Sequence, residues 1–395
     1  MGTPYGLIEM LELELKGRKG IFAEDSSTKD MLGKGFYGNK IDKKLKLGIV
    51  EALYLLDERN ARCTSSGEEI NFSRLSEKFW RSNKFIARYF TYRDWRDRGL
   101  VAEEPNSIKE KSFETPVKRY PSGSLIISGS LKVSGIFFKS DLMTILNEEK
   151  EGKELYERYW LGQYGSYKAA DRGKFNKLDI YETLYLLNKK VLDVENIQRD
   201  ELFGYAKKRR KDFESLYEVY SDWRDKGYVI KTGFKFGTHF RVYFPGAKPG
   251  AANGDEKIHS KHVIQVFPKD SKLLISEWAR AVRVAHSVRK TFIMAVPGKT
   301  GRKSAKIDFV LYHRNGGEAD NPKNAEPKFA MLSLGEEEYI GGSDFAAAIA
   351  EAKRKKLELL LAIVDRETSV TYYRVKQIML GKSNNEYYEI DWFQP

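Results

Sequence analysis

The chain has 395 residues and a net charge of +13, and 41% of its residues are hydrophobic and 13% aromatic. This composition is typical of a globular protein of about two to four domains and excludes a mostly disordered chain. No apolar run approaches the roughly 18–20 residues of a membrane-spanning helix, and the N-terminus lacks a signal-peptide pattern. The single cysteine, Cys63, excludes an internal disulfide. We therefore expect a soluble, cytoplasmic protein.

The N-terminal half contains the same small module twice. The segment YRDWRDRGLV (92–101) recurs as YSDWRDKGYV (220–229), and the segments that precede each copy also match in the same order. The apolar residues of both segments recur at three- and four-residue spacing, which predicts a helix that a glycine ends. Trp95 and Trp223 are expected to anchor these two helices to a sheet.

A second, weaker duplication lies downstream. Residues 283–296 align with residues 350–364, and each segment is predicted to be a helix that runs into an apolar strand. A turn and a further strand are expected to follow in each copy, at 306–312 and at 369–375. The segment 314–327, rich in Gly, Asn and Pro, has the composition of a flexible tether between the copies.

Positive charge is concentrated in one segment. Residues 229–316 hold 17 Lys and Arg against 5 Asp and Glu, a net charge of +12, whereas residues 317–395 have a net charge of −4. All five histidines of the chain lie between residues 239 and 313. A basic segment that holds every histidine suggests a polyanionic partner and acid–base chemistry near neutral pH; the alternative is an ordinary solvated basic surface.

Within this basic segment, residues 235–243 alternate in the way a strand does. The alternation predicts that His239 and Tyr243 lie on one basic, polar face. His259 precedes the next predicted strand, whereas His262 falls inside that strand and is expected to be structural.

Residues 273–290 are predicted to form an amphipathic helix. Arg283 and Lys290 are two turns apart on its polar face, so we expect them to project side by side. The predicted buried stripe comprises Trp278, Val282, Val284, Ala285 and Val288.

A tyrosine, a histidine and a lysine without acidic metal ligands point to metal-free cleavage of RNA by its own 2′-hydroxyl. This reaction needs a base for the 2′ proton, an acid for the departing 5′ oxygen and a cation for the charge on the phosphoryl oxygens. A tyrosine can act as the base if nearby cations favour its phenolate, and histidine is the natural acid. No metal or cofactor is required, so none is expected.

Three segments carry a resemblance to a known family: YSDWRDKGYVIKTGFKFGTHFRVY (220–243), HSKHVIQVF (259–267) and RAVRVAHSVRKTFIMAV (280–296). They closely resemble the archaeal tRNA-splicing endonucleases, and the order of units resembles the three-unit, ARMAN-type homodimeric form. The resemblance implies that the substrate is precursor tRNA with a bulge–helix–bulge motif, recognised by its shape. It implies products that end in a 2′,3′-cyclic phosphate and a 5′-hydroxyl.

The same resemblance assigns roles to individual residues. It implies Tyr243 as the general base, His259 as the general acid and Lys290 as the stabiliser of the transition state. Arg283 fits an arginine that stacks on a bulged base. Further candidates for contact with the RNA are Lys248, in a loop longer than the family's, and Lys168, Arg172 and Lys174, at an insertion in the second module.

The downstream copy keeps the apolar pattern of the first copy but has neither its arginine nor its lysine, so we expect it to be structural. Its turn carries Asp365 and Glu367. The resemblance implies that such an acidic turn inserts into a basic pocket of a partner chain and holds a two-fold homodimer together; the alternative is a solvated turn. Trp392 and Phe393 are expected to anchor a subunit interface.

Two other functions remain open: a non-catalytic RNA-binding or assembly subunit, and a metal-dependent, structure-specific nuclease, which would need a cluster of Asp and Glu. The expected fold class is a multidomain α+β or α/β protein. It combines duplicated small α/β modules with a three-layer α/β nuclease-like domain and a degenerate partial copy of that domain. The predicted units are an N-terminal-only unit (1–118), the N-terminal module of the catalytic unit (119–228), the catalytic domain (229–316) and a non-catalytic C-terminal unit (317–395).

Overall fold

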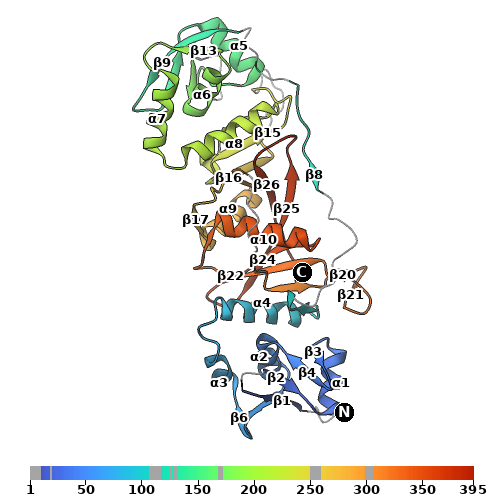
Figure 1. Ribbon diagram of the computed structural model, residues 1–395. Coiled ribbons are helices and arrows are strands. Elements are labelled where there is room, and N and C mark those ends of the chain that lie inside the picture. The colour runs from blue at the N-terminus through green and yellow to red at the C-terminus, as the bar shows by residue number, and fades with distance from the viewer. Residues whose placement is uncertain are drawn as a thin grey trace.

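The computed structural model describes residues 10–17, 20–105, 117–124, 127, 131–167, 172–249, 259–298 and 306–395. The molecule is elongated, with one small module at each end and a long sheet between them (Figure 1). This is the multidomain mixture of helices and strands that the sequence predicts. Within the described ranges, no helix has both the length and the apolar character needed to cross a bilayer.

One long sheet forms the centre of the molecule (Figure 1). In the order of their hydrogen bonding, its strands are β14 (Val229–Thr232), β15 (Phe240–Tyr243), β16 (His262–Val266), β18 (Thr291–Val296), β26 (Glu386–Phe393), β25 (Val370–Met379), β24 (Glu358–Val364), β22 (Phe329–Gly335), β19 (Phe309–Leu311) and β7 (Ala102–Glu103). Off this path, β8 (Lys118–Arg119) pairs with β25.

The two halves of this sheet have the same order of pairings when they are followed outward from the central β25–β26 hairpin. Each half has an antiparallel pair, then a parallel pair, then two antiparallel pairs. A parallel pair requires a crossover, and a helix supplies it on each side. These helices are α9 (Ile275–Ser287) and α10 (Gly342–Arg354), and the short strands that precede them, β17 (Lys272–Leu274) and β23 (Tyr339–Gly341), pair with each other.

The strand near 306–312 does not take the place that the sequence alignment predicts. β19 pairs with β22 and β7 at the far end of the sheet, and β26 is the strand that lies antiparallel to β18. The predicted equivalence of 306–312 with 369–375 is therefore wrong. The eight-residue β26 can pair along nearly all of the six-residue β18, whereas β19 has only three residues. The predicted domain boundary at residue 316 falls between β19 and β22, one of the two strands with which β19 pairs.

Helices cover both faces of the central sheet. Neighbouring residues of a strand point to opposite faces, and the buried cores follow this alternation. Ile264 and Ile293 belong to the core that helix α8 (Phe213–Asp225) closes. Val263 and Phe292 belong to the core that α9 and α10 close. The sheet is thus the middle layer of three.

Each end of the molecule is one small sheet with its own helices. In the first module the strands, in sheet order, are β3 (Asn39–Ile41), β4 (Lys44–Leu47), β2 (Ile21–Ala23), β1 (Leu11–Leu15), β5 (Ala61–Ser65) and β6 (Glu68–Ile70). Its helices are α1 (Ser26–Lys34), α2 (Ile49–Glu58), α3 (Phe72–Glu77) and α4 (Phe85–Asp97).

The second module has a sheet of five strands in place of six. In sheet order they are β11 (Gln163–Tyr164), β12 (Asn176–Asp179), β10 (Met143–Leu146), β9 (Val133–Phe138) and β13 (Leu192–Val194), and the helices are α5 (Glu149–Tyr159), α6 (Ile180–Asn188), α7 (Arg199–Arg209) and α8. The remaining elements are the hairpin of β20 (Arg314–Asn315) and β21 (Glu318–Ala319) and the 3₁₀ turn η2 (Phe234–Phe236).

The repeated ten-residue segment occupies the same place in both modules. Each copy contains the end of a thirteen-residue helix, α4 or α8. The glycine of each copy, which has a positive φ, lies just after the end of the helix. The two tryptophan side chains are fully buried. Trp95 lies against Tyr372 of β25, and Trp223 lies against Tyr387 of β26, with ring centroids 5.6 and 5.3 Å apart. The prediction that these tryptophans anchor helices to a sheet is confirmed.

In each module, the aspartate that precedes the tryptophan binds the tyrosine against which that tryptophan packs. The Tyr372 hydroxyl donates to Asp94 at 2.7 Å, and the Tyr387 hydroxyl donates to Asp222 at 2.6 Å. A buried hydroxyl needs such a partner, because leaving it unpaired is costly. Each copy of the segment therefore attaches one module to one strand of the central hairpin.

Candidate active site

The pairing of three strands brings Tyr243, His259 and Lys290 to one edge of the central sheet. Antiparallel pairing places the end of β15, which is Tyr243, beside the start of β16, and β16 begins three residues after His259. Parallel pairing places the starts of β16 and β18 side by side, and Lys290 directly precedes β18. Strand register alone therefore gathers the three predicted residues in one region.

Ser260 connects these three positions. The Lys290 ammonium donates hydrogen bonds to the Ser260 carbonyl oxygen and to Ser260 Oγ, the latter at 2.9 Å. The Ser260 side chain also interacts with the Tyr243 phenol. His259, which is exposed, is the covalent neighbour of Ser260. Ser260 is only 5% exposed, and in the sequence nothing but its place beside His259 points to it.

Burial favours the neutral forms of the phenol and the ammonium. It raises the pKa of Tyr243 above the usual value of 10, and the positive charge of Arg241 acts against this rise. Burial also lowers the pKa of Lys290 below 10.5, and Arg241 adds to the decrease. A phosphate bound between these groups would favour the charged lysine again, because an anion stabilises a nearby cation.

Two aromatic rings support the reactive groups. Tyr243 packs against Trp160 at the end of α5, with ring centroids 4.6 Å apart. The Lys290 ammonium lies 4.8 Å from the centre of the Phe236 ring, a cation–π distance. The second module and the η2 turn thus both contribute walls to the site.

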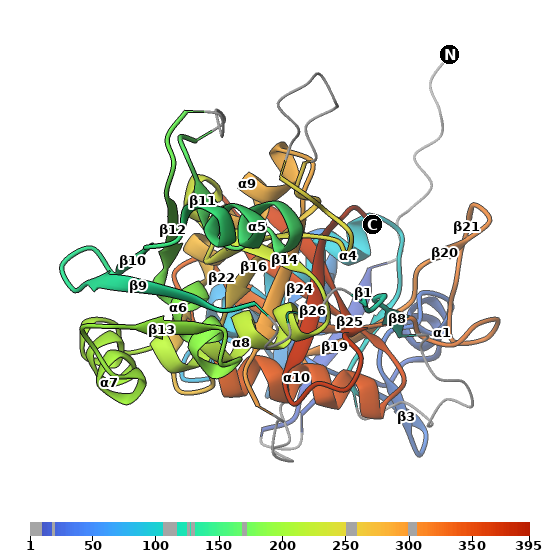
Figure 2. The same ribbon diagram turned by 90° about the horizontal axis from the view of Figure 1, so that it is seen from above.

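Tyr167 is a residue of this region that the sequence did not single out. Lys235 Nζ lies 3.4 Å from its hydroxyl and 4.7 Å from its ring centre. Burial would raise the pKa of Tyr167, but Lys235 and Arg241 together outweigh burial and lower it below 10. The site therefore has two phenols with opposite shifts in pKa, at Tyr167 and Tyr243. Tyr167 belongs to the β11–β12 hairpin, which lies on the same side of the molecule as α9 in Figure 2.

Helix α9 ends earlier than predicted. Its last residue is Ser287, and Arg289 turns the chain with a φ of +56°. The Lys290 N–H then bonds to the Ala285 carbonyl at 2.9 Å. Lys290 lies beyond the helix, so the prediction that it projects beside Arg283 from two turns away is wrong. The lysine instead lies where the chain enters β18.

The buried face of α9 is also narrower than predicted. Val284 and Val288 are 38% and 44% exposed. Val284 follows the buried Val282 by two positions and so points to the opposite side of the helix. Arg283 is exposed, and its charge opposes the rise in pKa that burial causes at Tyr373 of β25. The buried residues of the helix are Ile275, Trp278, Ala279, Val282 and Ala285.

The other predicted RNA-contacting cations lie on the surface. Lys248, Arg172 and Lys174 are exposed. The chain pairs through backbone hydrogen bonds on both sides of the insertion, including Ser166 N–H to the Arg172 carbonyl at 2.7 Å. Lys168 lies outside the described residues.

The strand predicted at 235–243 begins only at Phe240, because the residues before it form η2. His239 does not share a polar face with Tyr243: its Nδ1 accepts a hydrogen bond from the Val266 N–H at 3.0 Å, and burial lowers its pKa to about 4. His262 lies inside β16 and is 7% exposed, and burial lowers its pKa to about 4 as well. His262 is therefore structural, as predicted.

The predicted interface residues have local partners in this chain. Asp365 Oδ1 accepts hydrogen bonds from the backbone N–H of Glu367 and of Ser369, both at 2.9 Å, in the exposed turn between β24 and β25. Trp392 is 60% exposed. Phe393 is half-buried, and its ring packs against that of Phe329, with centroids 5.1 Å apart.

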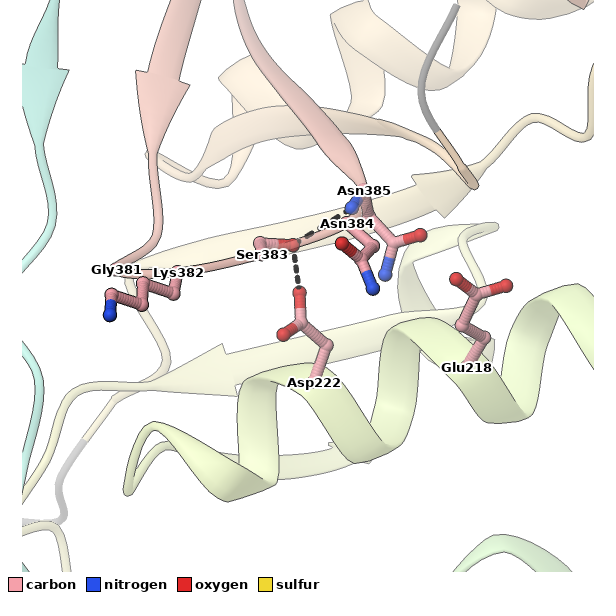
Figure 3. A pocket seen from close by; sticks show the side chains of 7 residues that line it. All are labelled: Glu218, Asp222, Gly381, Lys382, Ser383, Asn384 and Asn385. Carbon is pink, nitrogen blue, oxygen red and sulfur yellow. Dashed lines mark hydrogen bonds between the residues drawn. The ribbon is translucent and has the colours of Figure 1, made fainter.

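A pocket lined by Glu218, Asp222 and Lys382, among others, lies away from these residues, between α8 and the turn that joins β25 to β26 (Figure 3). Its volume is about 570 Å³, and Asp222 accepts a hydrogen bond from Ser383 Oγ at 2.5 Å within it. Burial, followed by the neighbouring Asp222 and Glu214, raises the pKa of Glu218. In the part of the chain that the structure describes, no group of three or more His, Cys, Asp and Glu is placed to hold a metal ion.

Two family models match this chain. Residues 213–305, which contain Tyr243, His259 and Lys290, match the family model of the tRNA intron endonuclease, catalytic C-terminal domain. Residues 11–76 match the model of the tRNA intron endonuclease, N-terminal domain.

The alignments with individual relatives cover most of the length of those relatives. The tRNA-splicing endonuclease of Methanopyrus kandleri is 34% identical over 167 residues, which are 41% of this chain and 88% of that protein. The tRNA-splicing endonuclease of Thermococcus onnurineus is 37% identical over 152 residues, 38% of this chain and 80% of that protein. That of Methanosarcina mazei is 25% identical over 350 residues, 73% of this chain and 96% of that protein.

The matched catalytic domain and the relatives named tRNA-splicing endonucleases define an RNA-cleaving enzyme. The chain belongs to the tRNA intron endonuclease family.

Proposed function

We propose that this protein removes introns from precursor tRNA by cutting both strands of a bulge–helix–bulge motif, without a metal ion. The relatives with which it aligns are named tRNA-splicing endonucleases. The observation that supports the proposal is the pairing of β15, β16 and β18, which brings the chain positions of Tyr243, His259 and Lys290 to one sheet edge, where Lys290 binds Ser260. Bulged nucleotides splay out of a helix and so expose the phosphates that such an edge can reach.

The proposed reaction is a transesterification within the RNA. Tyr243 takes the proton of the 2′-hydroxyl, and the 2′ oxygen attacks the adjacent phosphorus. The bond from phosphorus to the 5′ oxygen breaks, and His259 gives that oxygen a proton. The products are a 2′,3′-cyclic phosphate and a 5′-hydroxyl. Lys290 stabilises the added charge on the phosphoryl oxygens, and Arg241 stabilises the phenolate that forms at Tyr243.

Ser260 is expected to position both reactive groups. Replacing Ser260 by alanine removes the Oγ that Lys290 and Tyr243 share, while the carbonyl that Lys290 also contacts remains. We expect kcat to fall by about tenfold, with little change in KM, because the loss concerns orientation rather than binding. Single-turnover rates and RNA affinities of Ser260→Ala and Ser260→Thr provide the check, since threonine keeps the hydroxyl. An equal loss of kcat in both variants, or a change confined to KM, would contradict the positioning role.

Several cations are proposed to contact the RNA around this edge. Arg283 would stack on a bulged base from the exposed side of α9, which its exposure permits. The exposed Lys248, Arg172 and Lys174, together with Lys168, would bind backbone phosphates. Their spread over two loops and one helix suits recognition of RNA by shape.

We also propose that the enzyme works as a homodimer of the three-unit type, grown by duplication of an ancestral pair of domains. The proposed units are 1–118, 119–228, 229–316 and 317–395, and β19 of the third unit adds a strand beside β22 of the fourth. The equal order of pairings on both sides of the β25–β26 hairpin supports the duplication. The exposed turn with Asp365 and Glu367 would insert into a basic pocket of the partner subunit, and the exposed Trp392, with Phe393 behind it, would lie at the interface.

Cleavage of a bulged RNA in EDTA tests the proposed chemistry most simply. We expect an unchanged rate and products with a cyclic phosphate and a 5′-hydroxyl, identified by mass spectrometry. Loss of cleavage in the chelator, with recovery on addition of Mg²⁺, would instead indicate a metal-dependent nuclease. Binding of the RNA without cleavage would indicate a non-catalytic subunit.

A further inference from the structure

Phe234 is the most exposed of the large hydrophobic side chains that the structure describes, at 85%. Exposed hydrophobic residues are common, but one beside a reactive site merits an explanation. Phe234 begins the η2 turn between β14 and β15, the strand that ends at Tyr243.

Hydrogen bonds and the flanking glycines Gly233 and Gly237 fix the turn that presents Phe234. The Phe236 N–H bonds to the Gly233 carbonyl at 2.8 Å, and the Gly233 N–H bonds to the His239 carbonyl at 3.0 Å. A Cβ on Gly233 would lie 2.5 Å from Thr238 Oγ1, so no other residue fits there without a shift. The backbone therefore holds the Phe234 ring out in solvent.

The two residues after Phe234 tie this turn to the site. The Lys235 ammonium contacts the hydroxyl and the ring of Tyr167. The Phe236 ring lies under the Lys290 ammonium. Phe234 thus begins a turn whose next two side chains contact Tyr167 and Lys290, on the segment that leads into β15.

The surroundings select the chemistry of the partner. An exposed aromatic ring on a turn that carries Lys235 and also contacts Lys290 suits a ligand that is both aromatic and anionic. An unpaired nucleotide has this combination, because its base offers a π-face and its phosphate a negative charge. A second protein chain would have to bury these cations, which is costly without paired acids.

We propose that Phe234 stacks on an unpaired nucleobase next to the scissile phosphate. The proposal rests on the proposed function for its RNA substrate. A stacked base would hold the backbone of the bulge in place while the phosphate enters the edge at Ser260. Stacking of one base on an aromatic side chain is typically worth about 1–3 kcal/mol. An effect of about tenfold on affinity is therefore expected.

The test measures binding to a bulged RNA that carries 2′-deoxyribose at the cleavage positions, so that no cutting occurs. We expect Phe234→Ala to bind about tenfold more weakly than the parent protein and Phe234→Trp to bind as well as the parent. The matched control is Phe138→Ala, which removes another exposed phenylalanine, 44% exposed on β9 of the second module. This control should leave affinity unchanged, and thermal unfolding should show that all variants are folded.

RNAs with a single abasic site at each unpaired position identify the stacked base. At one position, the abasic RNA should bind the parent protein and Phe234→Ala equally. Unchanged affinity of Phe234→Ala for intact RNA would overturn the proposal. It would also be overturned if Phe234→Ala bound every abasic RNA more weakly than the parent protein did, by the same factor. A shift of Phe234→Ala to a smaller species in sedimentation would assign the ring to a second copy of the chain. Binding is measured here without cleavage. A protein that binds the RNA through Phe234 but does not cleave it would therefore contradict the proposed function and leave the stacking proposal intact.

Discussion

Replacing His259 by alanine should lower the single-turnover cleavage rate by about 10²–10⁴-fold, while the affinity for the RNA stays the same. In the proposed reaction His259 gives a proton to the departing 5′ oxygen, and without it an alkoxide must leave unprotonated. His259 is exposed and precedes β16, so the substitution removes no core packing. Rates on a bulged RNA at saturating enzyme, with thermal unfolding as a check on folding, measure the effect.

A substrate with sulfur in place of the 5′ bridging oxygen separates this role from others. A thiol is a far stronger acid than an alcohol, so sulfur leaves without a proton. On this substrate we expect His259→Ala to cleave at nearly the rate of the parent protein. An undiminished defect would show that His259 does not act as the general acid. His286→Ala, a histidine on the C-terminal turn of α9, is the matched control and should cleave both substrates normally.

Replacing Tyr243 by phenylalanine should lower the cleavage rate by a similar factor, about 10²–10⁴-fold, again with unchanged affinity. The substitution removes one hydroxyl and keeps the ring that packs on Trp160, so the protein should remain folded. Burial raises the pKa of this phenol, and the base function therefore depends on Arg241 and the interaction with Ser260, which oppose the rise. The same single-turnover assay applies, and the sulfur substrate should not rescue Tyr243→Phe.

Tyr167→Phe is the informative control for this experiment. Its phenol belongs to the same region, and its pKa is lowered in spite of burial by Lys235 and Arg241, so on acidity alone it is the easier base. We expect Tyr167→Phe to reduce the rate by less than about tenfold, because Tyr243 rather than Tyr167 ends the strand beside His259. A large loss at Tyr167 with a small loss at Tyr243 would reverse the assignment.

The sequence predicts the repeated anchoring segments well, because each is a local signal. Helical spacing, a buried tryptophan and a terminal glycine act within ten residues, and Trp95 and Trp223 lie where this pattern places them. The grouping of Tyr243, His259 and Lys290 comes from the family resemblance, and strand register supplies its structural basis.

The errors arise where non-local contacts decide. The alignment makes 306–312 the equivalent of 369–375, but β19 pairs with β22 and β7, since chain order does not determine which strands pair. The spacing of apolar residues predicts a helix that extends to Lys290, but no spacing rule shows that α9 ends at Ser287. The η2 turn replaced the first half of a predicted strand, since alternation in a short segment does not separate a strand from a turn. Ser260 and Tyr167 went unnoticed because small or single polar residues carry no pattern.

The claim that a phenol, an imidazole and an ammonium act on one phosphate can be measured directly. A crystal structure of the protein with a bulged RNA, blocked by 2′-deoxyribose at the cleavage position, gives the distances. We expect the Tyr243 hydroxyl near the 2′ carbon, a His259 ring nitrogen near the 5′ oxygen and Lys290 Nζ near a phosphoryl oxygen. Both polar contacts to the phosphate group should fall within about 2.6–3.2 Å. A scissile phosphate bound elsewhere, or one that only a single member of the trio can reach, would contradict this claim.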